Sequence, residues 1–146
     1  MVLALTYISP TANGQTNSSS GHIPVIDSDR WRICTMPDLG PLNGPDQSKQ
    51  HIVDHGFIKN DEGKWILWAC MRGTAPGRIL YGWEGASLTD SPWESTGIVA
   101  RALPEWGEKT NPESIQAHYF MKCDSGYYCF YNFKGIKLAR LKWEKE

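Results

Sequence analysis

The sequence lacks the features that mark several large classes of protein. No window of the 146-residue chain holds the roughly 18–20 consecutive apolar residues of a membrane-spanning helix. The charge is nearly balanced, with 15 Lys and Arg against 16 Asp and Glu, and only the run 137–142 is locally basic. We interpret that run as the solvated face of a strand. Because a nucleic-acid-binding protein should show a basic patch or stripe, we expect neither a membrane nor a nucleic acid as a partner.

Common catalytic and cofactor signatures are also absent. The chain contains no GxSxG motif for a nucleophilic serine and no glycine-rich loop for a phosphate. Its four cysteines have no CxxC spacing, which argues against a structural zinc site. Cys70 and Cys129 fall in apolar runs, where a free cysteine behaves as a small buried hydrophobe, although a disulfide stays open for an exported protein. We therefore expect no cofactor and no bound metal.

The localisation of the protein stays open. Residues 1–12 include a short apolar stretch, but they lack the cationic region and the length of an ordinary secretory signal. The stretch is compatible with a clipped signal peptide or with a start site inside a longer gene. The two explanations are equally compatible with the stretch, and between localisations we lean to a secreted or periplasmic protein.

Aromatic side chains are abundant. The chain has seven Trp and six Tyr. Such side chains suit half-buried sheet surfaces, and they also suit sugar platforms, because a ring offers a flat apolar face with a polar edge. Composition alone does not choose between these two roles.

The chain contains an internal repeat. The stretch 51–68, HIVDHGFIKNDEGKWILW, returns in the run that ends HYFMKCDSGYYCFY at Tyr131. At one constant offset the matched pairs are His55 with His118, Phe57 with Phe120, Lys59 with Lys122, Asp61 with Asp124, Gly63 with Gly126, Trp65 with Tyr128 and Trp68 with Tyr131. Self-similarity at a period of several tens of residues is typical of repeat architectures, in which one unit cannot bury its faces alone.

Each repeat unit predicts strands rather than helices, because no i, i+3, i+4 pattern of apolar residues persists. The expected strands are 52–59, 64–70, 78–84 and 95–100 in the first unit, and 115–122, 127–132 and 136–143 in the second. In the strand 78–84, Ile79, Tyr81 and Trp83 should share one face and Leu80 the other. Four antiparallel strands in roughly 50 residues make one propeller blade. We therefore predict an all-β fold of about two β-propeller blades.

The two blades should span residues about 51–101 and about 114–146, with the second blade incomplete. Residues 9–21 are too polar and small to pack, and residues 1–22 should form a flexible arm before a partial propeller domain at 23–146. A further strand is expected within 23–33, followed by a long ordered loop at 36–47 that is rich in Pro and Gly.

With residues 51–144 laid out in this way, the chain resembles the five-bladed β-propeller glycoside hydrolases. That superfamily includes arabinanases and xylosidases (family 43) and invertase-like enzymes (family 32). The resemblance rests on VDHGF at 53–57 and on QAHYF at 116–120, each followed by a Gly-containing turn and an aromatic strand, and on the segment 72–85. It implies hydrolysis of an O-glycosidic bond in a carbohydrate substrate by two carboxyl groups.

The resemblance also implies roles for individual residues. Asp54 matches the carboxylate of the first blade and would be the catalytic base or nucleophile; the alternative is a strand-edge aspartate bonded to the backbone. His55, His118, Arg72 and Trp83 are the candidate substrate-binding residues. A metal on His51, His55 and Asp54 is disfavoured, because neighbouring residues of a strand point to opposite faces.

The second unit departs from the family pattern. Its inner strand has Ala117 followed directly by His118, where the family usually has an Asp after Ala-Pro. His118 would then either contact the substrate or, together with His55, line a polar channel. Glu113 is a substitute carboxylate, but it follows Asn-Pro and is expected in a loop.

Three functions are compatible with the sequence. The first is a glycoside hydrolase whose general acid lies outside the chain, so that residues 1–146 hold at most half of a catalytic pair. The second is a non-catalytic carbohydrate-binding module, and the third is a truncated propeller without activity of its own. Because two blades leave exposed strand edges, we also expect self-association through those edges.

Overall fold

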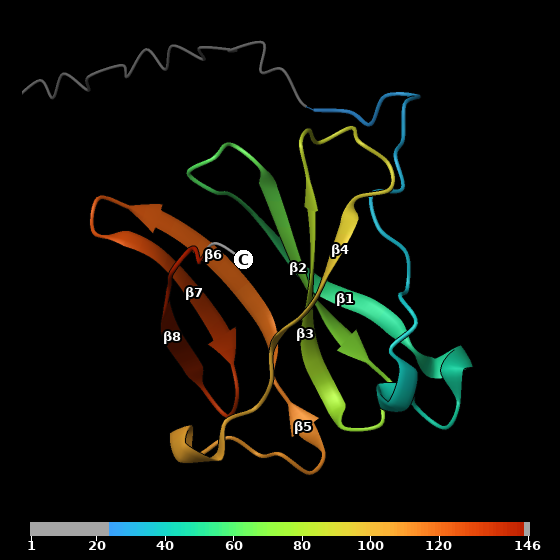
Figure 1. Ribbon diagram of the computed structural model, residues 1–146, viewed down its shortest axis with the longest axis vertical. Helices are drawn as coiled ribbons and strands as arrows, with labels where there is room; N and C mark the ends of the chain where they lie inside the picture. Colours follow the sequence, from blue (N-terminus) through green and yellow to red (C-terminus); the bar gives the residue numbers. More distant parts are fainter. Residues whose placement is uncertain (1–23, 145–146) are drawn as a thin grey trace, which may run out of the picture. The chain divides into compact units, whose positions relative to one another are not determined.

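The computed structural model describes residues 24–144 (Figure 1). The predicted flexible arm at 1–22 lies outside these residues. The chain divides into two units, 1–30 and 31–146, and all the strands described below belong to the second unit. The strand expected within 23–33 was a wrong prediction, because residues 24–33 contain none. Around Ser28, local bonds compete with strand pairing: its backbone N–H and its hydroxyl both donate to the Asp27 carboxylate.

The first sheet is an antiparallel meander, as predicted for the first repeat unit. Its strands lie in the order β1 (His51–Lys59), β2 (Trp65–Arg72), β3 (Gly77–Gly85) and β4 (Glu94–Ala100). A short fifth strand that the sequence did not predict, β5 (Glu113–Ser114), pairs with β3 in parallel. This pairing brings the β5 backbone so close that a Cβ on Gly77 would lie 2.4 Å from the Glu113 carbonyl oxygen. Only a glycine allows that approach.

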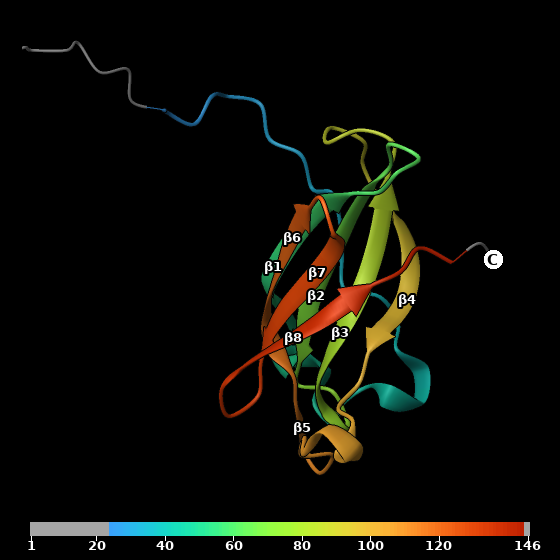
Figure 2. The same ribbon diagram turned by 90° about the vertical axis from the view of Figure 1, so that its left-hand side faces the viewer.

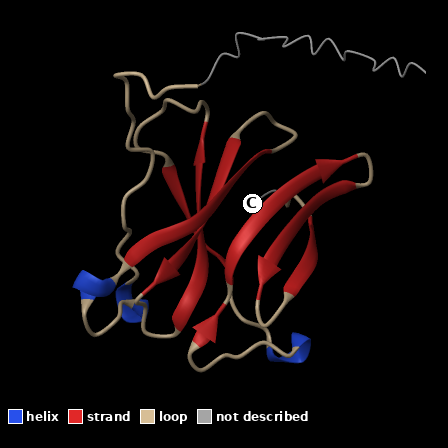
Figure 3. Cartoon of the chain, turned by 180° about the vertical axis from the view of Figure 1, so that it is seen from behind, coloured by secondary structure: helices blue, strands red, loops and turns tan. Residues whose placement is uncertain are grey.

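The second sheet contains the three predicted strands of the second repeat unit. They are β6 (Gln116–Cys123), β7 (Gly126–Asn132) and β8 (Ile136–Leu141), joined as an antiparallel meander. Figure 3 shows that the described chain consists of strands and loops, apart from short 3₁₀ turns. These turns are η1 (Gly40–Leu42), η2 (Gln47–Lys49) and η3 (Pro104–Trp106). The all-β prediction is confirmed, and no helix in the described part of the chain has the length and hydrophobicity to cross a membrane.

The first sheet buries apolar side chains on both of its faces. One face carries Ile79, Tyr81 and Trp83, as the alternation along β3 predicts, and it packs against Met36 and neighbouring residues of the segment before η1. The opposite face carries residues such as Leu80 and Ile58, which pack against side chains of the second sheet. Figure 2 shows β6, β7 and β8 lying in front of the first sheet. The two sheets thus stack face to face around a shared core.

The repeat extends to the backbone and to specific contacts. Lys59 lies over the ring of its cross-strand partner Trp65, with Nζ 5.4 Å from the ring centroid. In the second sheet, Lys122 lies over its partner Tyr127 at 4.7 Å. Trp65 therefore corresponds to Tyr127, and not to Tyr128 as the sequence alignment predicted. Four residues separate Lys122 from Tyr127, whereas five separate Lys59 from Trp65, and a constant offset cannot follow that change.

Candidate functional site

The candidate site is built around Asp54, at a bulge in β1. The pairing of β1 with β2 shifts register between Val53 and His55, and Asp54 takes the left-handed conformation, with φ 44°. Aspartate tolerates this conformation better than most residues, and a bulge redirects the side chain that it carries. The Asp54 carboxylate is therefore turned out of the regular strand pattern, and its side chain is 33% exposed.

The same bulge occurs in the second repeat without a carboxylate. Ala117, the counterpart of Asp54, has φ 50° and lies within a register shift between Gln116 and Tyr119. A positive φ is unfavourable for alanine, which has no polar side chain to bond locally. The bend is therefore a property of the repeat, whereas the carboxylate is particular to the first copy.

Asp54 pairs with Arg72, which is linked through the amide of Gln116 to a second arginine, Arg78. Arg72 at the end of β2 donates from Nη2 to Asp54 Oδ2 at 3.1 Å and to Gln116 Oε1 at 3.1 Å. Arg78 in β3 donates from Nη1 to the same Gln116 oxygen. The cluster Asp54, Arg72, Arg78 and Gln116 thus connects both sheets, and we call it the arginine cluster.

His118, which follows Ala117 in β6, is placed in the core and not in the open site. It is 5% exposed, its ring packs against Trp68 and Phe120, and Nε2 donates to the Trp68 carbonyl at 2.7 Å. Within residues 24–144, Nδ1 is buried and has no hydrogen-bond partner. Burial, the largest influence, lowers the pKa of His118, while the Trp68 carbonyl and Asp54 act in the opposite direction. His118 is therefore a structural residue of the core, and its buried ring is not placed to contact a substrate as the sequence predicted.

The lowered pKa of His118 predicts a pH dependence of stability. The folded protein holds a neutral ring, whereas the unfolded chain protonates near the ordinary value of about 6.5. The contribution of His118 to the free energy of unfolding is therefore fully present above that pH. It is lost as the pH falls through the folded pKa, at a rate of at most about 1.4 kcal/mol per pH unit. Urea unfolding of the wild type from pH 7 to pH 5 should show this loss. His118→Gln should flatten the dependence of the unfolding free energy on pH, whereas His51→Gln, a change at an exposed histidine, should not. Equal pH profiles for the wild type and both variants would contradict the role given to His118.

The other predicted substrate-binding residues divide between surface and core. Arg72 belongs to the arginine cluster. His55 is exposed, and its ring meets Phe57 edge to face at 5.7 Å. Trp83 does not join the site, because it is 3% exposed and packs against Tyr81 in the core of the first sheet. A buried ring offers no face to a sugar.

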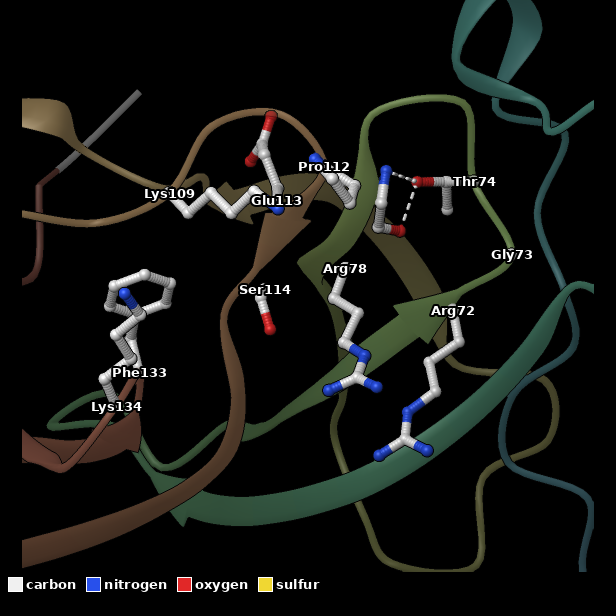
Figure 4. Close-up of a pocket in the computed structure, with 11 residues that line it drawn as sticks. Arg72, Gly73, Thr74, Arg78, Lys109, Pro112, Glu113, Ser114, Phe133 and Lys134 are labelled. Atoms are coloured by element: carbon white, nitrogen blue, oxygen red, sulfur yellow. Dashed lines mark hydrogen bonds between the residues drawn. The ribbon is translucent and has the colours of Figure 1, made fainter.

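A cavity of about 500 Å³ opens next to the arginine cluster. Arg72 and Arg78 line it, together with Ser114, Lys109 and Lys134 (Figure 4). In the close-up the two guanidinium groups lie next to each other, and the lysines come from the opposite side of the cavity. Sequence reasoning overlooked Gln116 and both lysines; the one available signal was the polar Gln116 at the repeat position of the apolar Val53.

Glu113 also lines the cavity, but it is held by an ion pair of its own. It was expected in a loop; instead it lies in β5 with its side chain 4% exposed. Arg101 donates from Nε at 2.7 Å and the Ala102 N–H donates at 3.0 Å. The carboxylate is thus fully engaged, which argues against its use as a substitute catalytic acid.

The described residues contain no group of three or more His, Cys, Asp or Glu side chains that could hold a metal ion. The four cysteines at 34, 70, 123 and 129 are free thiols, and Cys70 and Cys129 are buried. In comparisons with protein-family models, with curated proteins and with solved structures, no match to the chain was found.

Proposed function

We propose that the chain forms two neighbouring blades of a five-bladed β-propeller glycoside hydrolase, with Asp54 as base or nucleophile in the cleavage of an O-glycosidic bond. The observation that carries the proposal is the pair of matching bulges. Both repeats bend their first strand in the same way, but only the first places a carboxylate at the bend. A left-handed residue inside a strand costs free energy of order 1–3 kcal/mol, and such positions cluster at functional sites.

The stacking of the two sheets supports the propeller part of the proposal. Ile58 and its cross-strand partner Ile66 face the second sheet and are buried by it. Their counterparts in the second sheet are Met121 and its partner Tyr128, on the face that points away from the first sheet. We call that face the outer face. By the repeat, it corresponds to the face of the first sheet that packs against the second sheet. A further blade would cover it by the same packing.

The exposed apolar residues of the outer face are Tyr119, Met121, Ile136 and Leu138. Ile136 in the edge strand β8 is 81% exposed, and contiguous apolar surface of this kind marks interaction sites. A second copy of the chain can present the same face across a two-fold axis. This contact, together with the open β8 edge, is the self-association that we propose for the chain.

Self-association predicts a concentration-dependent sedimentation coefficient. Leu138→Lys should shift the chain toward monomer in sedimentation velocity, because a charge in an apolar contact must be desolvated. Leu88→Lys replaces an exposed leucine in the β3–β4 loop and serves as the matched control. A monomeric wild type, or equal shifts for both variants, would contradict the role of the outer face.

A second candidate function is non-catalytic carbohydrate binding. It is favoured by the contacts of the Asp54 side chain, whose hydrogen bonds and ion pairs within residues 24–144 involve only Arg72. Hydrolysis needs a second carboxyl group about 5–10 Å away. In our proposal that group, the general acid, comes from outside the chain.

Reducing-end release from a panel of neutral and acidic polysaccharides tests the two functions. The full-length protein should release reducing ends from at least one polysaccharide and should also bind it. Binding without release would replace the hydrolase by the binding module. Neither binding nor release would overturn both.

A further inference from the structure

The cavity beside the arginine cluster has an excess of positive charge. Four cationic side chains line it: Arg72, Arg78, Lys109 and Lys134. The one carboxylate in its wall, Glu113, is already paired with Arg101, which is not among the lining residues. Among the described residues, neither lysine forms an ion pair with a carboxylate. The walls therefore leave several positive charges without a negative partner.

The positive charges of the two arginines lie close together and are only partly neutralised. Arg72 and Arg78 donate to a single neutral oxygen, that of Gln116, so two guanidinium groups lie within a few ångströms of each other. Like charges at this separation repel, and repulsion grows as water is excluded. Within residues 24–144, Arg72 is the one of the two with a carboxylate partner, and the exposed Asp54 can offset one charge of the two. A second anion would remove the remaining repulsion.

The Nε donor of Arg72 is buried and has no hydrogen-bond partner within residues 24–144. A buried donor without a partner costs about 1–3 kcal/mol. Guanidinium groups bind carboxylates and sulfates through pairs of parallel N–H bonds, which suits the fork that Arg72 and Arg78 form together.

We propose that this cavity binds the anionic group of an acidic glycan, either the carboxylate of a uronic acid unit or a sulfate ester. The inference rests on the proposed function and names its substrate class. The volume of about 500 Å³ lies within the range of pockets for small ligands, about 300–1,000 Å³. Because Arg72 both lines the cavity and pairs with Asp54, an anion held here lies one side chain away from the catalytic carboxylate. The cavity would then select which sugar unit is placed at Asp54.

Isothermal titration of the full-length protein tests the inference with three oligosaccharides of matched length: an oligogalacturonate, a sulfated galactan fragment and a neutral arabino-oligosaccharide. At least one acidic oligosaccharide should bind about tenfold or more tightly than the neutral one, as expected for charge-assisted pairs. The affinity should fall as the salt concentration rises. The acidic oligosaccharide that binds identifies the group as carboxylate or sulfate.

Three variants locate the binding. Arg78→Gln should weaken binding of the acidic oligosaccharide about tenfold, and Lys109→Gln, in an exposed loop, should weaken it without any threat to the fold. Arg140→Gln removes an exposed arginine outside the cavity and should leave the affinity unchanged. Thermal unfolding of each variant shows that the protein is folded.

The possible failures are distinguishable. Equal affinity for neutral and acidic oligosaccharides, unchanged in Arg78→Gln and Lys109→Gln, would overturn the charge selectivity and leave the proposed function standing. Binding of inorganic sulfate through Arg78, with no binding of any glycan, would overturn the carbohydrate function and the glycan inference together.

Discussion

Asp54→Asn should lower the turnover of glycosides by the full-length protein about 10²- to 10⁴-fold, the usual contribution of a positioned base. The change removes the charge and keeps the shape of the side chain. Asparagine also tolerates the left-handed conformation that residue 54 adopts, so the bulge should survive. Reducing-end release gives the rate, and circular dichroism with urea unfolding gives the state of the fold.

The repeat supplies a matched control for this variant. Ala117→Asn places the same side chain at the corresponding bulge of the second sheet, where there is no carboxylate to lose. It should leave turnover within about twofold of the wild type, because its position carries no proposed chemistry. Near-normal activity of Asp54→Asn would remove Asp54 from the mechanism. A large loss in both variants would mean that the bulges matter for structure alone.

Much of the fold could be predicted from local sequence. The strands of the two repeat units follow from short apolar and aromatic runs, and each of these was placed to within about two residues. The strand expected within 23–33 was wrong, and β5 was not predicted. The faces of β3 follow from alternation, which put Trp83 with Tyr81 and opposite Leu80. Alternation does not say which face is covered. Trp83 was assigned to a sugar site because the sequence gives no sign that the segment before η1 packs over it.

The site could be predicted only in part, because it is assembled from contacts between distant residues. Asp54 was predicted from the resemblance, in which it matches the carboxylate of the first blade. Gln116 was not, since its importance comes from the two arginines that converge on it from β2 and β3. His118 was misplaced for a similar reason: the sequence cannot show that its ring lies under Gly56, where an added Cβ would be 3.4 Å away.

The ion pair beside the cavity should make the second large difference, because its Glu113 side chain is buried while Arg101 is 40% exposed. Glu113→Ala should lower the free energy of unfolding by about 1–3 kcal/mol, the usual cost of leaving a buried donor without its acceptor. The loss leaves the Arg101 guanidinium and the Ala102 N–H without their acceptor. Urea denaturation measures the change, and a domain of this size has only about 5–15 kcal/mol in total.

The exposed pair between Lys64 and Glu84 is the control for Glu113→Ala. Its side chains are 48% and 25% exposed, so Glu84→Ala should cost about 1 kcal/mol or less. The contrast isolates burial, since both variants remove a glutamate from an ion pair. Glu113 lies in β5 and Arg101 just beyond β4, so their pair closes the connection that leads from the first sheet into the second. If the two variants lose the same small amount, that connection is held by backbone pairing with Gly77 and not by charge.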